Sequence, residues 1–191
     1  MPILGIMASA ISGNLWAPGK DFDSIAGTVT VGGAGASSVT FSSIPATYKH
    51  LQVRYIARSD NAANTLNLNM IHNSDTGSNY SWHRVFGNGT TAGAGGGGST
   101  TVEIISQVPG ATNASNIFGT GIVNIFDYTN TSKYKTSRTL GGYEENTGAG
   151  AAIQLFSGCW YSTTAVNSLT FTLSSSSNFV QYSQIALYGV K

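Results

Sequence analysis

Charged side chains are scarce in this sequence, since lysine, arginine, aspartate and glutamate make up 9% of its 191 residues. A typical soluble domain carries about 25%. The formal net charge is +1, which provides no basic field to concentrate phosphates and disfavours a primary role in nucleic-acid binding. Neutral serine, threonine, asparagine and glycine must supply solubility. Such a composition either suits a medium of variable ionic strength or simply accompanies an all-β fold.

Cysteine is nearly absent, because Cys159 is the only one. It has no intramolecular disulfide partner, and its place in an apolar run predicts a buried, inert thiol. A secretory signal is not expected either: no basic residue precedes the apolar residues 1–11, and a proline and a glycine interrupt them. This segment is also too short to cross a bilayer.

A helical period is lacking after residue 20, and alternation of apolar and polar residues takes its place. Leu51, Val53 and Tyr55 form one such series, which is typical of a strand with one face in a core. About ten segments of this kind, separated by glycine, serine and asparagine turns, predict an antiparallel β-sandwich. We favour a jelly-roll arrangement, with an immunoglobulin-like sandwich as the alternative. The predicted strands cover residues 25–31, 39–41, 50–58, 65–71, 80–86, 101–108, 117–128, 134–143, 152–161, 168–174 and 179–190.

Three connections carry further expectations. Ile44 and Pro45 cannot continue a central strand, because proline has no amide hydrogen, so we expect the chain to turn a corner over residues 44–48. The glycine-rich residues 87–99 predict a mobile loop at the tip of an extended hairpin. Residues 117–128 are apolar on both faces and are expected at the centre of the fold, whereas Lys133, Lys135 and Arg138 are expected on or near the solvent side.

The sequence divides into an N-terminal arm, residues 1–24, and one β-sandwich domain, residues 25–191. Leaving the apolar side chains of the arm in water would be costly, so we expect the arm to dock on a neighbouring subunit. The alternative is that it covers its own sandwich. The candidate assembly residues of the arm are Ile3, Leu4, Ile6, Met7, Ile11, Leu15 and Trp16.

No combination of residues predicts catalysis, a metal site or a cofactor. Glycoside hydrolysis uses two carboxylates across one bond, but the adjacent Glu144 and Glu145 would point to opposite faces of a strand. The three histidines lack the short spacing of metal ligands. The glycine tract is not followed by the Lys-Ser or Lys-Thr of a phosphate loop, and no nucleophile elbow is present. We therefore expect no enzyme activity.

Aromatic side chains leave open a role in recognition. Exposed flat rings beside arginine or asparagine can stack on sugars while the polar groups bind hydroxyls. The candidate glycan contacts are Tyr80, Trp82, Arg84 and Tyr143. The alternative is that the large aromatics fill the core, as is common in sandwiches.

Three segments carry a resemblance to a known class of proteins. The pattern Phe-x-x-Ile-Pro-x-x-Tyr-x-x-Leu-x-Val over residues 41–53 resembles a segment that recurs in small structural proteins of tailed bacteriophages, especially those of marine and freshwater hosts. Residues 1–13 resemble the opening of such proteins, and residues 185–191 resemble their closing strand.

This resemblance implies a non-enzymatic component of the virion, in keeping with the missing signal peptide. The leading expectation is a tail-fibre or other appendage subunit that is attached through its arm, and a head-decoration protein is the nearest variant. Phage appendages of this kind resemble trimers, so the expected partners are two further copies and other virion proteins, without nucleic acid or membrane insertion. The alternative from another class is a lectin-like module that binds host surface polysaccharide.

Overall fold

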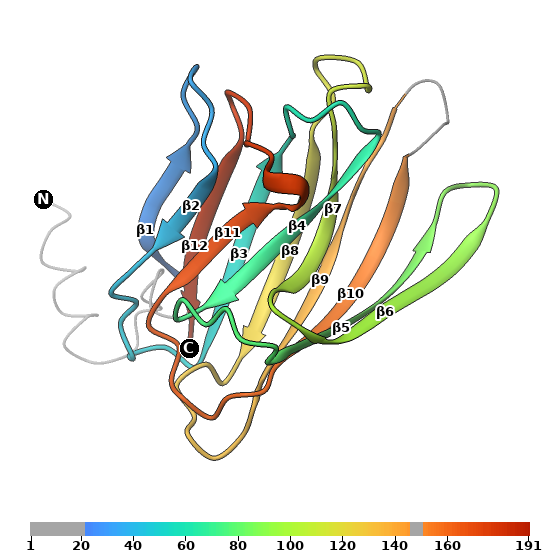
Figure 1. The fold of residues 1–191 in the computed structure, drawn as a ribbon. Coiled ribbons are helices and arrows are strands. Elements are labelled where there is room, and N and C mark those ends of the chain that lie inside the picture. The colour runs from blue at the N-terminus through green and yellow to red at the C-terminus, as the bar shows by residue number, and fades with distance from the viewer. Residues whose placement is uncertain (1–21, 146–150) are drawn as a thin grey trace, which may run out of the picture.

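The chain folds as a two-layered β-sandwich, seen in a computed structural model that describes residues 22–145 and 151–191. Two antiparallel sheets face each other, and one single-turn 3₁₀ helix, η1 (Ser174–Ser176), accompanies the strands (Figure 1). The all-β class and the sandwich predicted from the alternation are therefore confirmed. The candidate arm residues 3–16 lie outside the described residues.

The larger sheet has eight strands in the order β1-β12-β3-β8-β9-β10-β5-β6. Its strands are β1 (Phe22–Thr30), β3 (His50–Ala57), β5 (Tyr80–Gly87), β6 (Ala92–Thr100), β8 (Gly119–Phe126), β9 (Lys135–Tyr143), β10 (Ala152–Trp160) and β12 (Gln184–Val190). The smaller sheet has the order β2-β11-β4-β7. It consists of β2 (Ser38–Phe41), β4 (Thr65–His72), β7 (Glu103–Pro109) and β11 (Leu169–Leu173).

Successive strands alternate between the two sheets at both ends of the chain. The chain passes from β1 to β2, β3 and β4 by changing sheets each time, and the later pairs β7–β8 and β11–β12 also divide between the sheets. The predicted corner at residues 44–48 is one of these crossings, and Ile44 is buried there. This strand order is compatible with a jelly roll to which β5, β6, β9 and β10 are added at one side of the larger sheet.

The core lies between the sheets and follows the alternation of the sequence. Leu51, Val53 and Tyr55 of β3 point inwards and are buried, whereas their neighbours point out. Leu68 of β4 and Phe171 of β11 are fully buried in the smaller sheet. Side chains from the two inner faces thus interdigitate, which is how sandwiches exclude water.

The glycine tract corrects one prediction, because it forms the edge strand β6 rather than a loop. Glycine is depleted in strands, but here the side chains of β5 cover the glycines of their partner strand. A Cβ on Gly97 would lie 2.9 Å from Nε1 of Trp82, and one on Gly93 would lie 2.5 Å from the ring of Phe86. Covering of this kind by cross-strand aromatics stabilises glycine in a sheet. The β5–β6 hairpin stands at one side of the larger sheet, beyond the smaller one (Figure 1).

Lys135 corrects another prediction, since its side chain is buried instead of facing solvent. Its ammonium group donates hydrogen bonds to the carbonyl oxygens of Asn130 at 2.6 Å, Lys133 at 3.1 Å and Thr163 at 3.2 Å. The lysine therefore joins the turn before β9 to the segment after β10. Loss of solvation lowers its pKa.

Candidate functional site

The outward face of the larger sheet carries a row of apolar side chains. Ile122, Leu140, Leu155 and Val85 are direct cross-strand neighbours on β8, β9, β10 and β5. Between 41% and 57% of each side chain is exposed. Ile56 and Ile153 extend the row towards one end of these strands and are also exposed. We call these six residues the apolar outer face: Ile56, Val85, Ile122, Leu140, Ile153 and Leu155.

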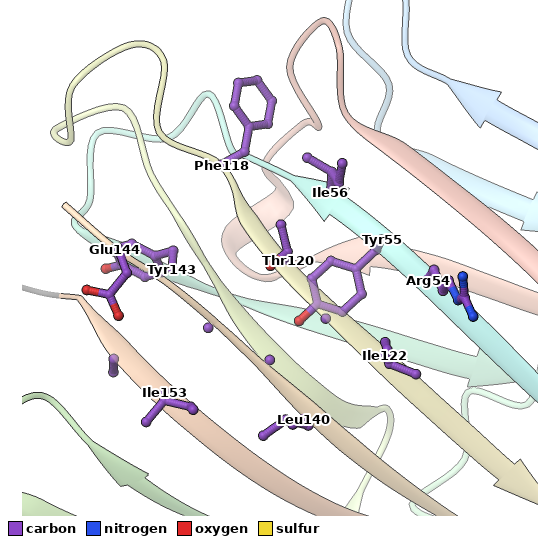
Figure 2. Close-up of a pocket in the computed structure, with 14 residues that line it drawn as sticks. Arg54, Tyr55, Ile56, Phe118, Thr120, Ile122, Leu140, Tyr143, Glu144 and Ile153 are labelled. Carbon is purple, nitrogen blue, oxygen red and sulfur yellow. The ribbon is translucent and has the colours of Figure 1, made fainter.

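A hollow of about 670 Å³ opens in this face. Gly142 lies between Thr120 and Ile153 in the next line of cross-strand neighbours, so β9 presents no side chain at that position of the outer face. Figure 2 shows Ile122, Leu140 and Ile153 along one border of the hollow, with Arg54 and Glu144 on opposite sides. Phe118, Tyr143 and Thr120 also line the hollow, so its walls are mainly apolar, and the charged groups lie at the rim.

Two inward-facing glycines and a tyrosine form the support beneath the hollow. A Cβ on either Gly121 or Gly141 would lie 2.4 Å from the hydroxyl oxygen of Tyr55, so only glycine leaves room for this ring. The Tyr55 hydroxyl donates a hydrogen bond of 2.5 Å to Oγ of Ser106 in the facing sheet. Burial raises the pKa of Tyr55 to about 12, which keeps the hydroxyl protonated as a donor. The hollow therefore rests on a fixed link between the two sheets.

This arrangement is suited to binding an apolar partner. Arg54 and Glu144 stand on opposite sides, so no acid–base pair converges on a shared reacting atom. Residues 22–145 and 151–191 contain no group of three or more histidine, cysteine, aspartate or glutamate residues placed to hold a metal ion. Burial of apolar surface contributes about 25 cal/mol per Å², and this is the interaction that the walls offer.

A buried polar cluster in the core was not anticipated from the sequence. Nε2 of His72 lies 3.2 Å from Oε2 of Glu103, and Ser137 donates a hydrogen bond to the other carboxylate oxygen. The histidine ring stacks on Trp160, with ring centroids 5.1 Å apart. The serine contacts the carboxylate and not the imidazole, so the order of a catalytic triad is absent. All three polar residues are buried, which closes the cluster to substrates.

Cys159 is also unsuited to nucleophilic chemistry. It lies on β10 as a free cysteine of intermediate exposure, whereas the sequence predicted a buried thiol. Partial burial and, to a smaller extent, the charge of Glu103 raise its thiol pKa. Since the thiolate is the reactive form, a raised pKa makes the thiol less reactive at neutral pH.

The four candidate glycan contacts do not form one exposed surface. Tyr80 is fully buried, and its hydroxyl donates a hydrogen bond to the carbonyl oxygen of Asp75 at 2.8 Å. Tyr143 is also buried and shares a 2.7 Å hydrogen bond with Thr65. Neither ring can stack on a sugar, because the smaller sheet and its connections cover them. Trp82 and Arg84 of β5 are only partly buried and remain candidates.

A second hollow, of about 500 Å³, lies beside β1 and the segment that follows β2. Its lining mixes apolar side chains such as Val29 and Ile44 with the polar Thr40, Ser42 and Ser43. It is therefore smaller and more polar than the hollow of the apolar outer face.

The sequence contained one signal of the apolar outer face. Residues 117–128 were recognised as apolar on both faces and interpreted as central, and β8 is indeed an interior strand of the larger sheet. Within residues 22–145 and 151–191, however, no other layer covers its second apolar face, on which Ile122 and Phe126 are exposed. Leu140, Ile153 and Leu155 join Ile122 only through strand pairing, which the sequence does not specify.

Comparison of the chain with protein-family models, with curated proteins and with solved structures finds no match. Within the described part of the chain, no helix is long and apolar enough to cross a membrane.

Proposed function

We propose that this chain is a non-enzymatic structural subunit of a tailed-bacteriophage virion, of the tail-fibre or appendage type, that associates with two further copies. The observation that carries the proposal is the apolar outer face. Apolar patches of several hundred Å² rimmed by polar residues usually mark sites of protein interaction. The resemblance of residues 41–53 and of both end segments supplies the virion context.

Low charge supports the same proposal. With 9% charged residues, the surface has little like-charge repulsion to keep copies apart. When one patch of each copy binds a different patch of the next copy, the copies form a closed ring if the rotation between neighbouring copies permits it. A trimer is such a ring.

Two measurements test this function. Light scattering of the purified chain, whose mass is 19.8 kDa, should give three times that mass at micromolar concentration. Labelled antibodies against the chain should decorate an appendage on whole particles under the electron microscope. A monodisperse monomer would refute the trimer, and particles free of the label would refute the virion assignment. Label on the head surface would favour the head-decoration variant.

Trp82 and Arg84 favour a second candidate, a lectin-like surface for host polysaccharide. Both are partly exposed neighbours on the inward face of β5, and Nη1 of Arg84 lies 3.5 Å from Oε1 of Gln154. Such a group offers an indole ring for stacking and polar atoms for hydroxyls. Binding on a glycan array that is lost in Trp82→Ala, with the thermal unfolding curve unchanged, would support this candidate. No binding by the wild-type chain across host polysaccharides would exclude it.

A further inference from the structure

The chain enters the larger sheet on the same face that holds the hollow. Phe22, at the start of β1, stacks on Tyr188 of β12 with ring centroids 4.8 Å apart. The guanidinium carbon of Arg54 lies 5.1 Å from the Phe22 ring centroid and 5.2 Å from that of Tyr188. Arg54 also stands at the rim of the hollow (Figure 2). The residues that precede Phe22 therefore join the fold beside this rim.

The preceding segment is long enough to reach the hollow. Ile122, Leu140 and Ile153 of the hollow lie on β8 to β10, which are three to five strands away from β1. At about 4.8 Å per strand this is roughly 15–24 Å. About seven extended residues, at about 3.3 Å each, span that distance. Since 21 residues precede Phe22, about two thirds of them remain to occupy the hollow.

The composition of this segment matches the walls of the hollow. Residues 1–19 contain no charged side chain, and Ile3, Leu4, Ile6 and Met7 provide aliphatic groups at close spacing. The hollow likewise presents mainly apolar walls and has its charged groups at the rim. Residues 146–150, which adjoin the hollow in sequence, are Asn-Thr-Gly-Ala-Gly and carry no large apolar side chain.

From these observations we infer that the hollow of the apolar outer face binds the apolar N-terminal segment, residues 3–16, of this polypeptide. The aliphatic side chains of the segment pack against Ile122, Leu140 and Ile153. The proposed function determines only which copy supplies the segment: insertion into the next copy repeats around the trimer and holds it together. This is the exchange of an identical element between protomers.

Hydrogen–deuterium exchange of the full-length chain tests the binding. Leu140→Asp places a carboxylate on the wall of the hollow, where an apolar segment would have to desolvate it. The matched control is Thr136→Asp, which adds the same charge at an exposed position of the same strand and face, outside the hollow. The peptides that cover residues 3–16 should exchange about tenfold faster or more in Leu140→Asp than in wild type. They should keep the wild-type rate in Thr136→Asp.

Four outcomes of exchange measurements would overturn the inference. The first is exchange of residues 3–16 at the rate of an unfolded peptide in wild type. The second is equal rates in Leu140→Asp and wild type. The third comes from a further variant, Val29→Asp, which adds a charge to the second hollow. Loss of protection of residues 3–16 in this variant but not in Leu140→Asp would place the segment in the second hollow. Protection of β9 and β10 without protection of the segment would instead identify sheet-to-sheet contact between copies and would also overturn it.

Disulfide trapping identifies the copy that supplies the segment. In a Cys159→Ser background, Ile6→Cys and Ile153→Cys should form a disulfide on mild oxidation, whereas Ile6→Cys with Thr136→Cys should not. Covalent dimers and trimers on a non-reducing gel would support both the docking and the proposed assembly. A bond within one chain would support the docking but remove the arm from the assembly. If no disulfide forms, the docking is overturned, and light scattering remains the test of the trimer.

Discussion

Removal of a single hydroxyl group at Tyr55 should produce a pH-dependent change in stability. The buried hydroxyl donates to Ser106 across the two sheets. A hydrogen bond of this kind contributes about 1 kcal/mol. We therefore expect Tyr55→Phe to lower the free energy of unfolding by about 1 kcal/mol at pH 7.

The same substitution should behave differently in alkali. Burial raises the folded-state pKa of Tyr55 from 10.0 to about 12. The unfolded chain therefore loses the tyrosine proton first, so the stability that the protonated hydroxyl confers is complete below pH 10 and is lost as the pH rises through 12. The difference of about two pH units between the folded and unfolded pKa lowers the free energy of unfolding by about 1.4 kcal/mol at pH 11. The reduction reaches about 2.7 kcal/mol once Tyr55 is ionised in both states. Tyr55→Phe cannot undergo this loss, so its deficit at pH 7 should vanish near pH 11.

Urea unfolding followed by tryptophan fluorescence at pH 7, 9 and 11 measures both effects. Tyr182→Phe is the control, because that ring is 66% exposed and remains in water in both states. Its stability should follow the wild type at each pH. A constant difference between Tyr55→Phe and wild type from pH 7 to pH 11 would show that Tyr55 ionises alike in both states, and the reasoning would fail.

Three further predictions concern the core and the turns. Gly158→Ala should lower the free energy of unfolding by about 3 kcal/mol in thermal melts, because its Cβ would lie 1.9 Å from the buried Glu103 carboxylate. Gly98→Ala, which meets nothing within 4 Å, should melt like wild type. Lys135→Met should lower the melting temperature, since it leaves buried carbonyls without a donor; an unchanged melting temperature would contradict the role assigned to this lysine. Hydrogen bonds from Lys133 and Lys49 lower the pKa of Asp127 from 3.8 to about 2. The Asp127 carboxylate should therefore stabilise the fold above pH 4, and this stabilisation should be lost as the pH falls through 2. Asp127→Asn should therefore be less stable than wild type at pH 5 but equal to it below pH 2 in urea unfolding, and a difference that is the same at both pH values would contradict this.

The alternation of apolar and polar residues in the sequence determined the strands and the class of the fold. In β3 the period of two assigned each side chain to the core or to the outside, because successive side chains of a strand point to opposite faces. In β4 it fails at Asn69, which is buried where the pairing with β7 shifts register. The corner at Ile44 and Pro45 followed from the missing amide hydrogen of proline. These are local properties, which a single stretch of sequence contains.

Pairing between distant strands decided the rest. The glycines of β6 form a strand only because Trp82 and Phe86 of β5 cover them. Lys135 is buried because carbonyl oxygens from two separate turns surround its ammonium group. Tyr80 was a candidate glycan contact, yet it is fully buried, and its hydroxyl is hydrogen-bonded to the backbone of His72 and Asp75.

The apolar outer face shows the same division between sequence and tertiary structure. The sequence determined that Ile122, Leu140 and Leu155 lie on strands, but it places them in three separate segments of the chain. Only the register of β8, β9 and β10 aligns them, and only the missing side chain at Gly142 leaves a hollow beside them. A surface of this kind depends on strand order, and strand order is set by contacts between residues far apart in the chain.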